Sequence, residues 1–226
     1  HAYGLGNACG NAACTAVAKE PGKNYNPLFI YGPSGLGKTH LMHAIANQVH
    51  ENHPDYKIIY VTSEEFGNDL ISSINDNNTA LFHDKYRNAD VLLIDDIQFF
   101  SNKERMQEEF FHTFNKLHAE GKQIVITSDK PPKELKTLED RIRSRFEWGL
   151  ITDISTPDFE TRIAIIRRKA ELLDLYIPDD VAEFIANRLK TNIRQLEGAV
   201  KKLKALKHLA GSAPSISMAQ SVIKDI

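Results

Sequence analysis

This sequence of 226 residues has few cysteines, lacks long apolar runs and carries nearly equal numbers of positive and negative charges. Its two cysteines, Cys9 and Cys14, have no second Cys or His pair at metal-ligand spacing, so a zinc site or a disulfide framework has little support. No apolar run approaches the roughly 18 residues of a membrane span, and the N-terminus shows no signal-peptide pattern, so we expect a cytoplasmic protein. The 28 Lys plus Arg and 30 Asp plus Glu give a net charge of -2, which argues against a surface wholly devoted to nucleic acid. Any contact with nucleic acid must therefore be local.

Short apolar, β-branched runs alternate along the chain with longer amphipathic stretches. These runs are nearly continuous in apolar residues, which is typical of parallel strands covered by helices on both faces. We therefore predict a three-layer α/β domain with a mostly parallel sheet. The five predicted strands are Leu28–Tyr31, Lys57–Val61, Val91–Ile94, Gln123–Thr127 and Leu150–Ile154.

The pattern changes after Pro157, because no further strand-like run appears there. Pro178 stands where a helix could begin and Gly211 where one could end. The predicted helices are 159–173, 178–189, 193–209 and 218–226. We predict an α/β nucleotide-binding domain over residues 1–156 and a small helical domain over residues 157–226.

A full match to the P-loop pattern follows the first predicted strand and precedes a helical stretch over residues 40–49. Its glycines let backbone N–H groups point at phosphate oxygens, and the helix N-terminus adds the positive end of its dipole. We expect Lys38 to neutralise the β- and γ-phosphates of ATP, and Thr39 to offer its hydroxyl to Mg²⁺. The residues assigned to the nucleotide here are Gly32, Gly35, Leu36, Gly37, Lys38, Thr39 and His40.

Two acids, Asp95 and Asp96, end the third predicted strand. Burying them without a cation is costly. We assign Asp95 to the nucleotide and its Mg²⁺, directly or through water, and Asp96 to polarising the attacking water. An alternative is that one of the two acids caps the next helix. Because Asp is one methylene shorter than Glu, we expect slow ATP hydrolysis, which suits a timer better than a motor.

Other polar residues are candidates for sensing the γ-phosphate. Asp129, at the end of the fourth strand, lies at the same edge of the sheet as Asp95, although residues 127–129 could instead cap a helix. Arg141 and Arg145 share a helix face, where arginines usually pair with acids or are solvated, and one of them could act on a neighbouring subunit's ATP. Arg194 opens a helix of the second domain and could fold back onto the phosphates.

Five segments together resemble the DnaA family of bacterial replication initiators: residues 25–32, 93–100, 107–115, 144–150 and 194–199. The resemblance covers nearly the whole chain. It implies an AAA+ fold with strand order 5-1-4-3-2 and a helical lid, and ATP-bound subunits that assemble into a filament on the replication origin and help to melt it. The ADP form would be inactive.

The resemblance also implies roles for individual residues. Asp129 would be the first sensor, Arg145 the arginine finger and Arg194 the second sensor, while Asn7 would lie near the adenine. Positions that contact single-stranded DNA in the family correspond to Ile71, Lys103 and Arg105. From the residues alone, Lys103 and Arg105 lie in a polar loop that could equally be solvated.

The sequence departs from the family in three respects. Pro33 and Ser34 stand in the P-loop where the initiators usually have Gly and a small residue, and residues 1–4 lack the usual aromatic-rich opening. No counterpart of the duplex-binding or helicase-recruiting domain is recognisable, so we expect a central core only.

Two alternative functions remain at the level of the sequence. A helicase loader or a regulatory relative of the initiator would share the fold and the sites, but residues 107–115 and 141–148 favour the initiator. A P-loop kinase or metabolic ATPase would have an acceptor pocket and brisk turnover, and we find no substrate-lid motif. The lysines of the third helix of the second domain could bind nucleic acid or acidic membrane phospholipid, but are better explained as a solvated face; they are Lys201, Lys202, Lys204 and Lys207.

Overall fold

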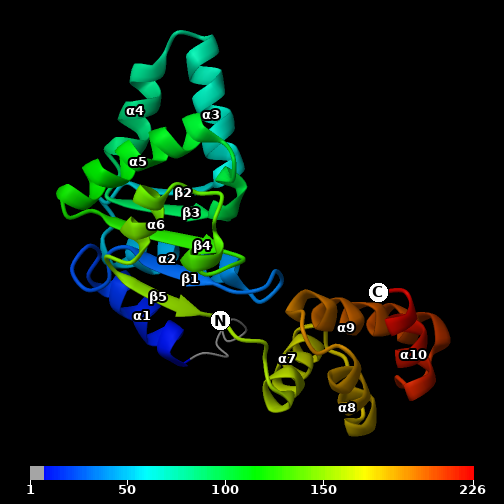
Figure 1. Ribbon diagram of the computed structural model, residues 1–226. Coiled ribbons are helices and arrows are strands. Elements are labelled where there is room, and N and C mark those ends of the chain that lie inside the picture. Colours follow the sequence, from blue (N-terminus) through cyan, green and yellow to red (C-terminus); the bar gives the residue numbers. More distant parts are fainter. Residues whose placement is uncertain (1–7) are drawn as a thin grey trace. The chain divides into compact units, whose positions relative to one another are not determined.

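The computed structural model describes residues 8–226, which form two compact units (Figure 1). The first unit comprises Lys38–Ile154 and the described residues up to Pro33, and it contains the sheet. The second comprises Ser155–Ile226 together with Ser34–Gly37, and it is helical.

A parallel sheet of five strands forms the centre of the first unit. The strand order is β2-β3-β4-β1-β5, which confirms both the predicted sheet and the order that the family resemblance implies. Because every pairing is parallel, the carboxyl ends of the strands meet at one edge of the sheet. The strands are β1 (Leu28–Tyr31), β2 (Ile58–Thr62), β3 (Val91–Asp95), β4 (Gln123–Ser128) and β5 (Leu150–Asp153).

Helices cover both faces of this sheet (Figure 1). On one side lie α1 (Ala8–Lys19) and α2 (Lys38–Asn52), and on the other α3 (Ser63–Asn75), α4 (Thr79–Arg87), α5 (Glu104–Ala119) and α6 (Asp140–Phe146). The second group encloses an aromatic core in which the Phe66 ring lies 5.2 Å from Phe82, 4.9 Å from Tyr86 and 5.7 Å from Phe100. Burial on both faces explains why the strand sequences are continuously apolar.

The second unit, described throughout, consists of α7 (Phe159–Leu172), α8 (Asp179–Arg188), α9 (Ile193–Ala210) and α10 (Ile216–Lys224). The buried Arg162 of α7 donates to the carbonyl of Ala186 in α8 and to that of Pro157 just before α7, at 2.8 Å each, and so links α7 to α8. Pro178 is the N-cap of α8, and Gly211 ends α9 with a left-handed φ of 71°. The beginning of α8 and the end of α9 therefore lie where Pro178 and Gly211 predicted them.

The described residues contain no cluster of three or more His, Cys, Asp or Glu side chains that could hold a metal ion. Cys14 is a buried free thiol, and its burial raises its pKa to about 12. None of the described helices is both long enough and apolar enough to cross a membrane.

Candidate nucleotide site at the carboxyl edge of the sheet

The carboxylate of Asp95 is the centre of the site. It ends β3 and is only 2% exposed. Its Oδ2 accepts hydrogen bonds from the hydroxyls of Thr39 and Tyr60, each at 2.8 Å, and its Oδ1 accepts one from Thr127. Three hydroxyls from α2, β2 and β4 thus converge on one carboxylate, and because hydroxyls are neutral they orient its negative charge without compensating it.

Lys38 lies beside this edge at the start of α2. Its ammonium is buried and donates to the carbonyl of Gly32 and, at 3.0 Å, to that of Pro33. Gly32 is required by a close approach, because a Cβ there would lie 2.6 Å from the carbonyl oxygen of Ile154. The Pro33 carbonyl is thus a partner of Lys38, so the proline leaves this contact intact.

The rest of the P-loop has the conformation expected of a glycine-rich turn. Gly35 and Gly37 adopt left-handed φ values of 84° and 93°, which side chains other than glycine rarely tolerate. Leu36 is fully buried, whereas His40 is exposed in the first turn of α2. The Leu36 side chain therefore contributes to packing, and the nucleotide contacts assigned to Leu36 and His40 stay predictions.

Asp96 has a strained backbone and an electrostatically disfavoured carboxyl group. Its φ of 61° is left-handed, and its N–H donates to the Thr127 hydroxyl at 2.9 Å. Asp96 is partly open to solvent, yet the protein packed around its carboxyl group and the nearby Asp95 carboxylate raise its pKa. Although Asp96 is the N-cap residue of η1 (Ile97–Phe100), its side chain makes no capping hydrogen bond, so the helix-cap alternative is not observed for it.

Gln98 connects the two outer acids of the site. Its Nε2 donates to Oδ1 of Asp96 at 3.3 Å, and its Oε1 accepts the N–H of Asp129 at 3.3 Å. The Oδ1 atom of Asp129 is buried and has no hydrogen-bond partner among the described residues. The next helix, η2 (Pro132–Glu134), is capped by Pro131 without a side-chain bond, so Asp129 is not its cap.

The oxygen atoms gathered here suit a hydrated magnesium ion. The Thr39 hydroxyl and the Asp95 carboxylate are adjacent hard donors, and Mg²⁺ in nucleotide sites takes one or two such protein oxygens along with phosphate and water. The unpartnered Asp129 oxygen is available to a further polar group at the same edge. These residues therefore fit a magnesium nucleotide.

Sequence reasoning missed two members of this site, Tyr60 and Gln98. Tyr60 stands in the middle of the predicted strand β2, and burial together with its bond to Asp95 raises its pKa, so it remains a hydrogen-bond donor. The sequence signal that could have identified Tyr60 was its polar hydroxyl in an otherwise apolar edge strand. The signal for Gln98 was its position two residues after the assigned Asp96.

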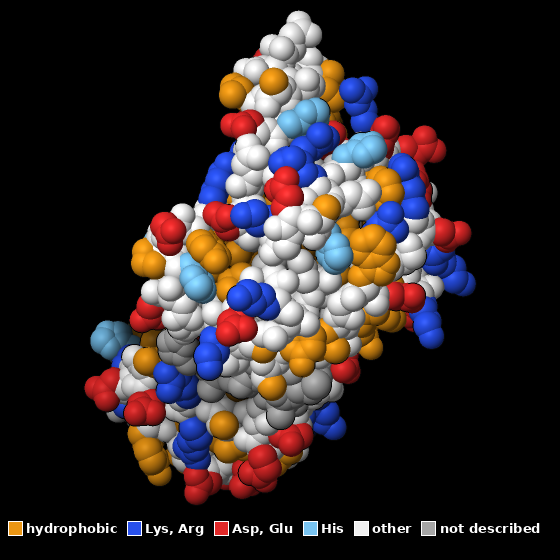
Figure 2. Space-filling view, turned by 90° about the vertical axis from the view of Figure 1, so that its left-hand side faces the viewer, with side chains coloured by type: hydrophobic (Ala, Val, Ile, Leu, Met, Phe, Trp, Pro, Cys, Tyr) orange, Lys and Arg blue, Asp and Glu red, His pale blue; other side chains and the backbone are white. Residues whose placement is uncertain are grey.

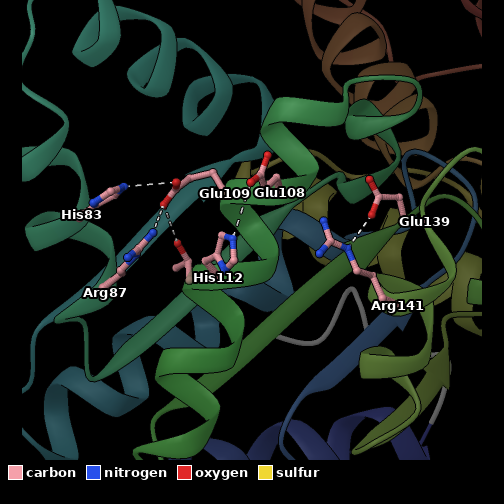
Figure 3. A network of polar contacts seen from close by, with 8 residues as sticks. His83, Arg87, Glu108, Glu109, His112, Glu139 and Arg141 are labelled. Carbon is pink, nitrogen blue, oxygen red and sulfur yellow. Dashed lines mark hydrogen bonds and ion pairs between the residues drawn. The ribbon is translucent and has the colours of Figure 1, made fainter.

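The three arginines of α6 differ in how their charge is balanced. Arg141 forms an ion pair with Glu139 at 2.6 Å (Figure 3), and Arg143 pairs with Asp140. Among the described residues, Arg145 pairs with no carboxylate; its Nε donates instead to the Asn115 side-chain oxygen at 3.0 Å. Arg145 is consequently the α6 arginine that keeps an unbalanced charge.

The structure corrects the expected loop setting of Lys103 and Arg105, two of the three residues assigned to single-stranded DNA. Arg105 is not in a loop, because α5 begins at Glu104 and the Lys103 carbonyl already accepts the Gln107 N–H at 3.0 Å. Lys103 is not freely solvated either: its ammonium donates to the Phe99 carbonyl at 2.9 Å and lies 4.0 Å from the Phe99 ring centroid. Ile71 is 47% exposed on α3, and Arg105 is also exposed.

The roles of two further assigned residues, Arg194 and Asn7, stay predictions. Arg194 is exposed in the first turn of α9, whose N-cap Asn192 accepts the Gln195 N–H at 3.3 Å. It belongs to the second unit, and its contact with a nucleotide stays a prediction. Asn7 lies outside the described residues.

The raised pKa of Asp96 generates a prediction about stability. The folded state disfavours the charged carboxyl, so Asp96 begins to destabilise the fold as pH rises above the ordinary value of 3.8, and the effect is complete above the raised pKa. We expect Asp96→Asn to raise the Tm of the nucleotide-free chain at pH 7.5, and the gain to shrink as pH falls towards 4. Thermal unfolding across this range measures it, with Glu183→Gln on the exposed face of α8 as the control. An equal gain in Tm at every pH would contradict this, and would mean that the variant is stabilised because Asn tolerates the left-handed backbone and not because a charge is removed.

Comparison with known proteins agrees with this geometry. The family model described as the bacterial DnaA ATPase domain matches residues 1–153. The chromosomal replication initiator protein DnaA of Caldanaerobacter subterraneus subsp. tengcongensis is 57% identical over 99% of this chain, which spans 50% of that relative's length. The crystal structure of domain III of the Thermotoga maritima initiator superimposes with a TM-score of 0.92 and 45% identity, covering 98% of this chain and 92% of that one. A replication initiator DnaA bound to AMPPCP and single-stranded DNA matches with a TM-score of 0.83 and 36% identity, covering 92% and 63% respectively. The chain therefore belongs to the bacterial DnaA family of replication initiators and contains its ATPase domain.

Proposed function

We propose that this chain is the nucleotide-switch core of a replication initiator. In its ATP form it assembles with further copies of itself on origin DNA, binds single strands and helps to unwind the origin, and slow hydrolysis to ADP ends that state. The observation that carries this proposal is the convergence of the Thr39, Tyr60 and Thr127 hydroxyls on the buried Asp95 carboxylate, beside the P-loop and Lys38. A related initiator bound to AMPPCP and single-stranded DNA supports the same ligands for this chain.

In this proposal the site binds ATP or ADP together with Mg²⁺. Thr39 and Asp95 would hold the ion, which when bound offsets phosphate charge. Lys38 exchanges its contacts with the loop carbonyls for the β- and γ-phosphates. Arg194 and Asn7 complete the site at the phosphates and the adenine, respectively, as the family resemblance implies.

Asp96 and Asp129 take different parts in hydrolysis. Asp96 orients the attacking water or accepts its proton. Asp129 accepts a hydrogen bond from that water, or from a donor that also bonds to the γ-phosphate. Gln98 bridges the two and fixes their separation. Because the short Asp96 side chain is tied to Gln98 and stands on a strained backbone, turnover is slow, as a timer requires.

The Lys38 ammonium provides a direct test of the nucleotide site. Replacing Lys38 with Ala removes the cation that faces the phosphates, so we expect the affinity for both ATP and ADP to fall by at least about tenfold, or roughly 1.4 kcal/mol. Calorimetric titration measures this, with Lys130→Ala as a matched control at an exposed lysine. An unchanged affinity of the Lys38 variant would end the P-loop assignment.

Arg145 is the residue that carries self-assembly in this proposal. Its guanidinium lies on the surface without a carboxylate partner among the described residues, whereas Arg141 and Arg143 are both paired (Figure 3 shows the Arg141 pair). An anion on a neighbouring subunit, such as the γ-phosphate of its ATP, would therefore be attracted to Arg145 without breaking an existing ion pair.

Arg145→Ala should separate nucleotide binding from assembly. A residue that acts on the neighbour contributes nothing to its own site, so we expect the variant to bind ATP as the parent does and to form no ATP-dependent oligomers. Calorimetry and sedimentation on the same samples decide this, and Arg143→Ala on the same helix is the control. Loss of ATP binding by the monomeric variant would replace the role in trans with a local structural one.

Single-stranded DNA binding is proposed for the exposed surface around Ile71, Lys103 and Arg105. On the face of the molecule shown in Figure 2, basic and acidic side chains are interspersed, in keeping with the net charge of -2. A single copy can thus neutralise few phosphates and should bind a strand weakly. Assembly would place one such patch per subunit along the strand, so that binding becomes cooperative and dependent on ATP.

Reversing two charges tests this surface. We expect Lys103→Glu combined with Arg105→Glu to abolish ATP-dependent binding to a labelled oligonucleotide and to flatten its salt dependence, with ATP affinity unchanged. Fluorescence anisotropy across a salt series measures both. Lys201→Glu combined with Lys202→Glu makes the same charge change on α9 and is the control. Binding that ignores ATP or survives the first pair of changes would place the DNA contact elsewhere.

The helicase-loader, kinase and phospholipid alternatives are weaker than the initiator. Family membership favours the initiator over a helicase loader or a metabolic kinase. The α9 lysines do not form one free cationic face, because Lys204 donates to the Asp174 carbonyl at 3.5 Å. A solvated helix explains them better than acidic phospholipid does, and lipid is not part of the proposed function.

A further inference from the structure

We propose that Phe111, Asn115 and Trp148 are positioning residues for Arg145, holding its guanidinium at the surface without neutralising its charge. This inference rests on the proposed function, in which Arg145 acts on the ATP of a neighbouring subunit. It adds the residues that make that arginine effective.

The three side chains come from two places in the chain and meet at one guanidinium. Phe111 and Asn115 stand one turn apart on α5, and Trp148 follows the end of α6. The guanidinium carbon of Arg145 lies 4.2 Å from the Trp148 ring centroid and 5.0 Å from that of Phe111. Its Nε donates to the Asn115 side-chain oxygen.

This environment differs in kind from that of the neighbouring arginines. An aromatic face attracts a cation through its quadrupole and an amide oxygen through its dipole, and neither carries a net charge. Arg141 also lies over Phe111, at 4.2 Å, but its charge is balanced by Glu139. Arg145 is thus oriented by three neutral groups, and an approaching phosphate needs to displace no carboxylate from it.

Trp148 is itself held in place although it is 51% exposed. Its ring lies 4.9 Å from that of His118 and 6.1 Å from that of Phe114, and the His118 ring stacks on Phe114 at 5.7 Å. Phe114 and His118 of α5 therefore hold the indole in place, and the indole ring in turn contacts the Arg145 guanidinium. A large aromatic that stays half exposed gains little from burial, which favours a role at the surface.

The test uses subunits that are damaged in only one of two roles. Asp96→Asn subunits should not hydrolyse ATP but keep an intact Arg145 to offer to a neighbour. Trp148→Leu subunits keep their own nucleotide site but present a poorly held Arg145. We expect ATP hydrolysis by Trp148→Leu alone to fall by about tenfold, and an excess of Asp96→Asn subunits to restore the rate per Trp148→Leu subunit.

Matched variants separate positioning from general damage. Trp148→Phe keeps an aromatic face and should retain most of the rate. Tyr176→Leu removes an aromatic that is 71% exposed in the second unit and should change nothing. Asn115→Asp should lower the rate even though it bonds Arg145 more strongly, because it neutralises the charge.

The outcomes distinguish this inference from the function on which it rests. A full rate for Trp148→Leu, a loss that Asp96→Asn subunits do not restore, or a full rate for Asn115→Asp would overturn the positioning role. Arg145→Ala subunits provide the reference in the same assay. If Asp96→Asn subunits fail to restore their rate, the action of Arg145 in trans is wrong and both proposals fall; if they restore it while Trp148→Leu is unimpaired, only the positioning role falls.

Discussion

A buried carboxylate at the end of a central strand is the constraint on which the nucleotide edge of this molecule depends. Asp95 is almost fully enclosed, and burying it would be costly without donors to orient it. The hydroxyls of Thr39, Tyr60 and Thr127 satisfy it and, in doing so, bind the first turn of α2 and strands β2 and β4 to the end of β3. The position of the P-loop helix relative to the sheet is therefore set by the same contacts that define the site.

Charge is distributed so that the site is complete only with additional ligands. Asp95, Asp96 and Asp129 gather at one edge of the sheet, where burial and, after it, the nearby Asp95 carboxylate raise the pKa of Asp96. The Lys38 ammonium opposes this rise at Asp96, and it donates hydrogen bonds to loop carbonyls. Arg145, in contrast, keeps an unbalanced positive charge on α6. A nucleotide with its ion, together with a neighbouring arginine, would balance charges that one subunit leaves unbalanced, which gives a physical reason for nucleotide binding and assembly to be coupled.

The sequence was most informative wherever a local pattern determined the outcome. The five strands were predicted to within one residue at each end, because burial on both faces makes parallel strands apolar throughout. The P-loop and its order between strand and helix follow from eight consecutive residues. Contacts across the chain were not predictable in this way: Arg145 meets Asn115 across 30 positions, and Tyr60 meets Asp95 across 35. Arg105 was placed in a loop because Lys103 and Glu104 read as polar, whereas the buried face that makes α5 a helix lies further along, at Phe110 and Phe114.

The central claim is that ATP, and not ADP, turns this chain from a monomer into an assembly that binds single-stranded DNA. Sedimentation velocity of the chain with Mg²⁺ and ATP, ADP or no nucleotide, each with and without a single-stranded oligonucleotide, tests this claim most directly. The account predicts a monomer without nucleotide and with ADP, and with ATP a larger species that grows and carries the oligonucleotide. An identical sedimentation coefficient in all three nucleotide states, or an assembly that forms equally well with ADP, would contradict it.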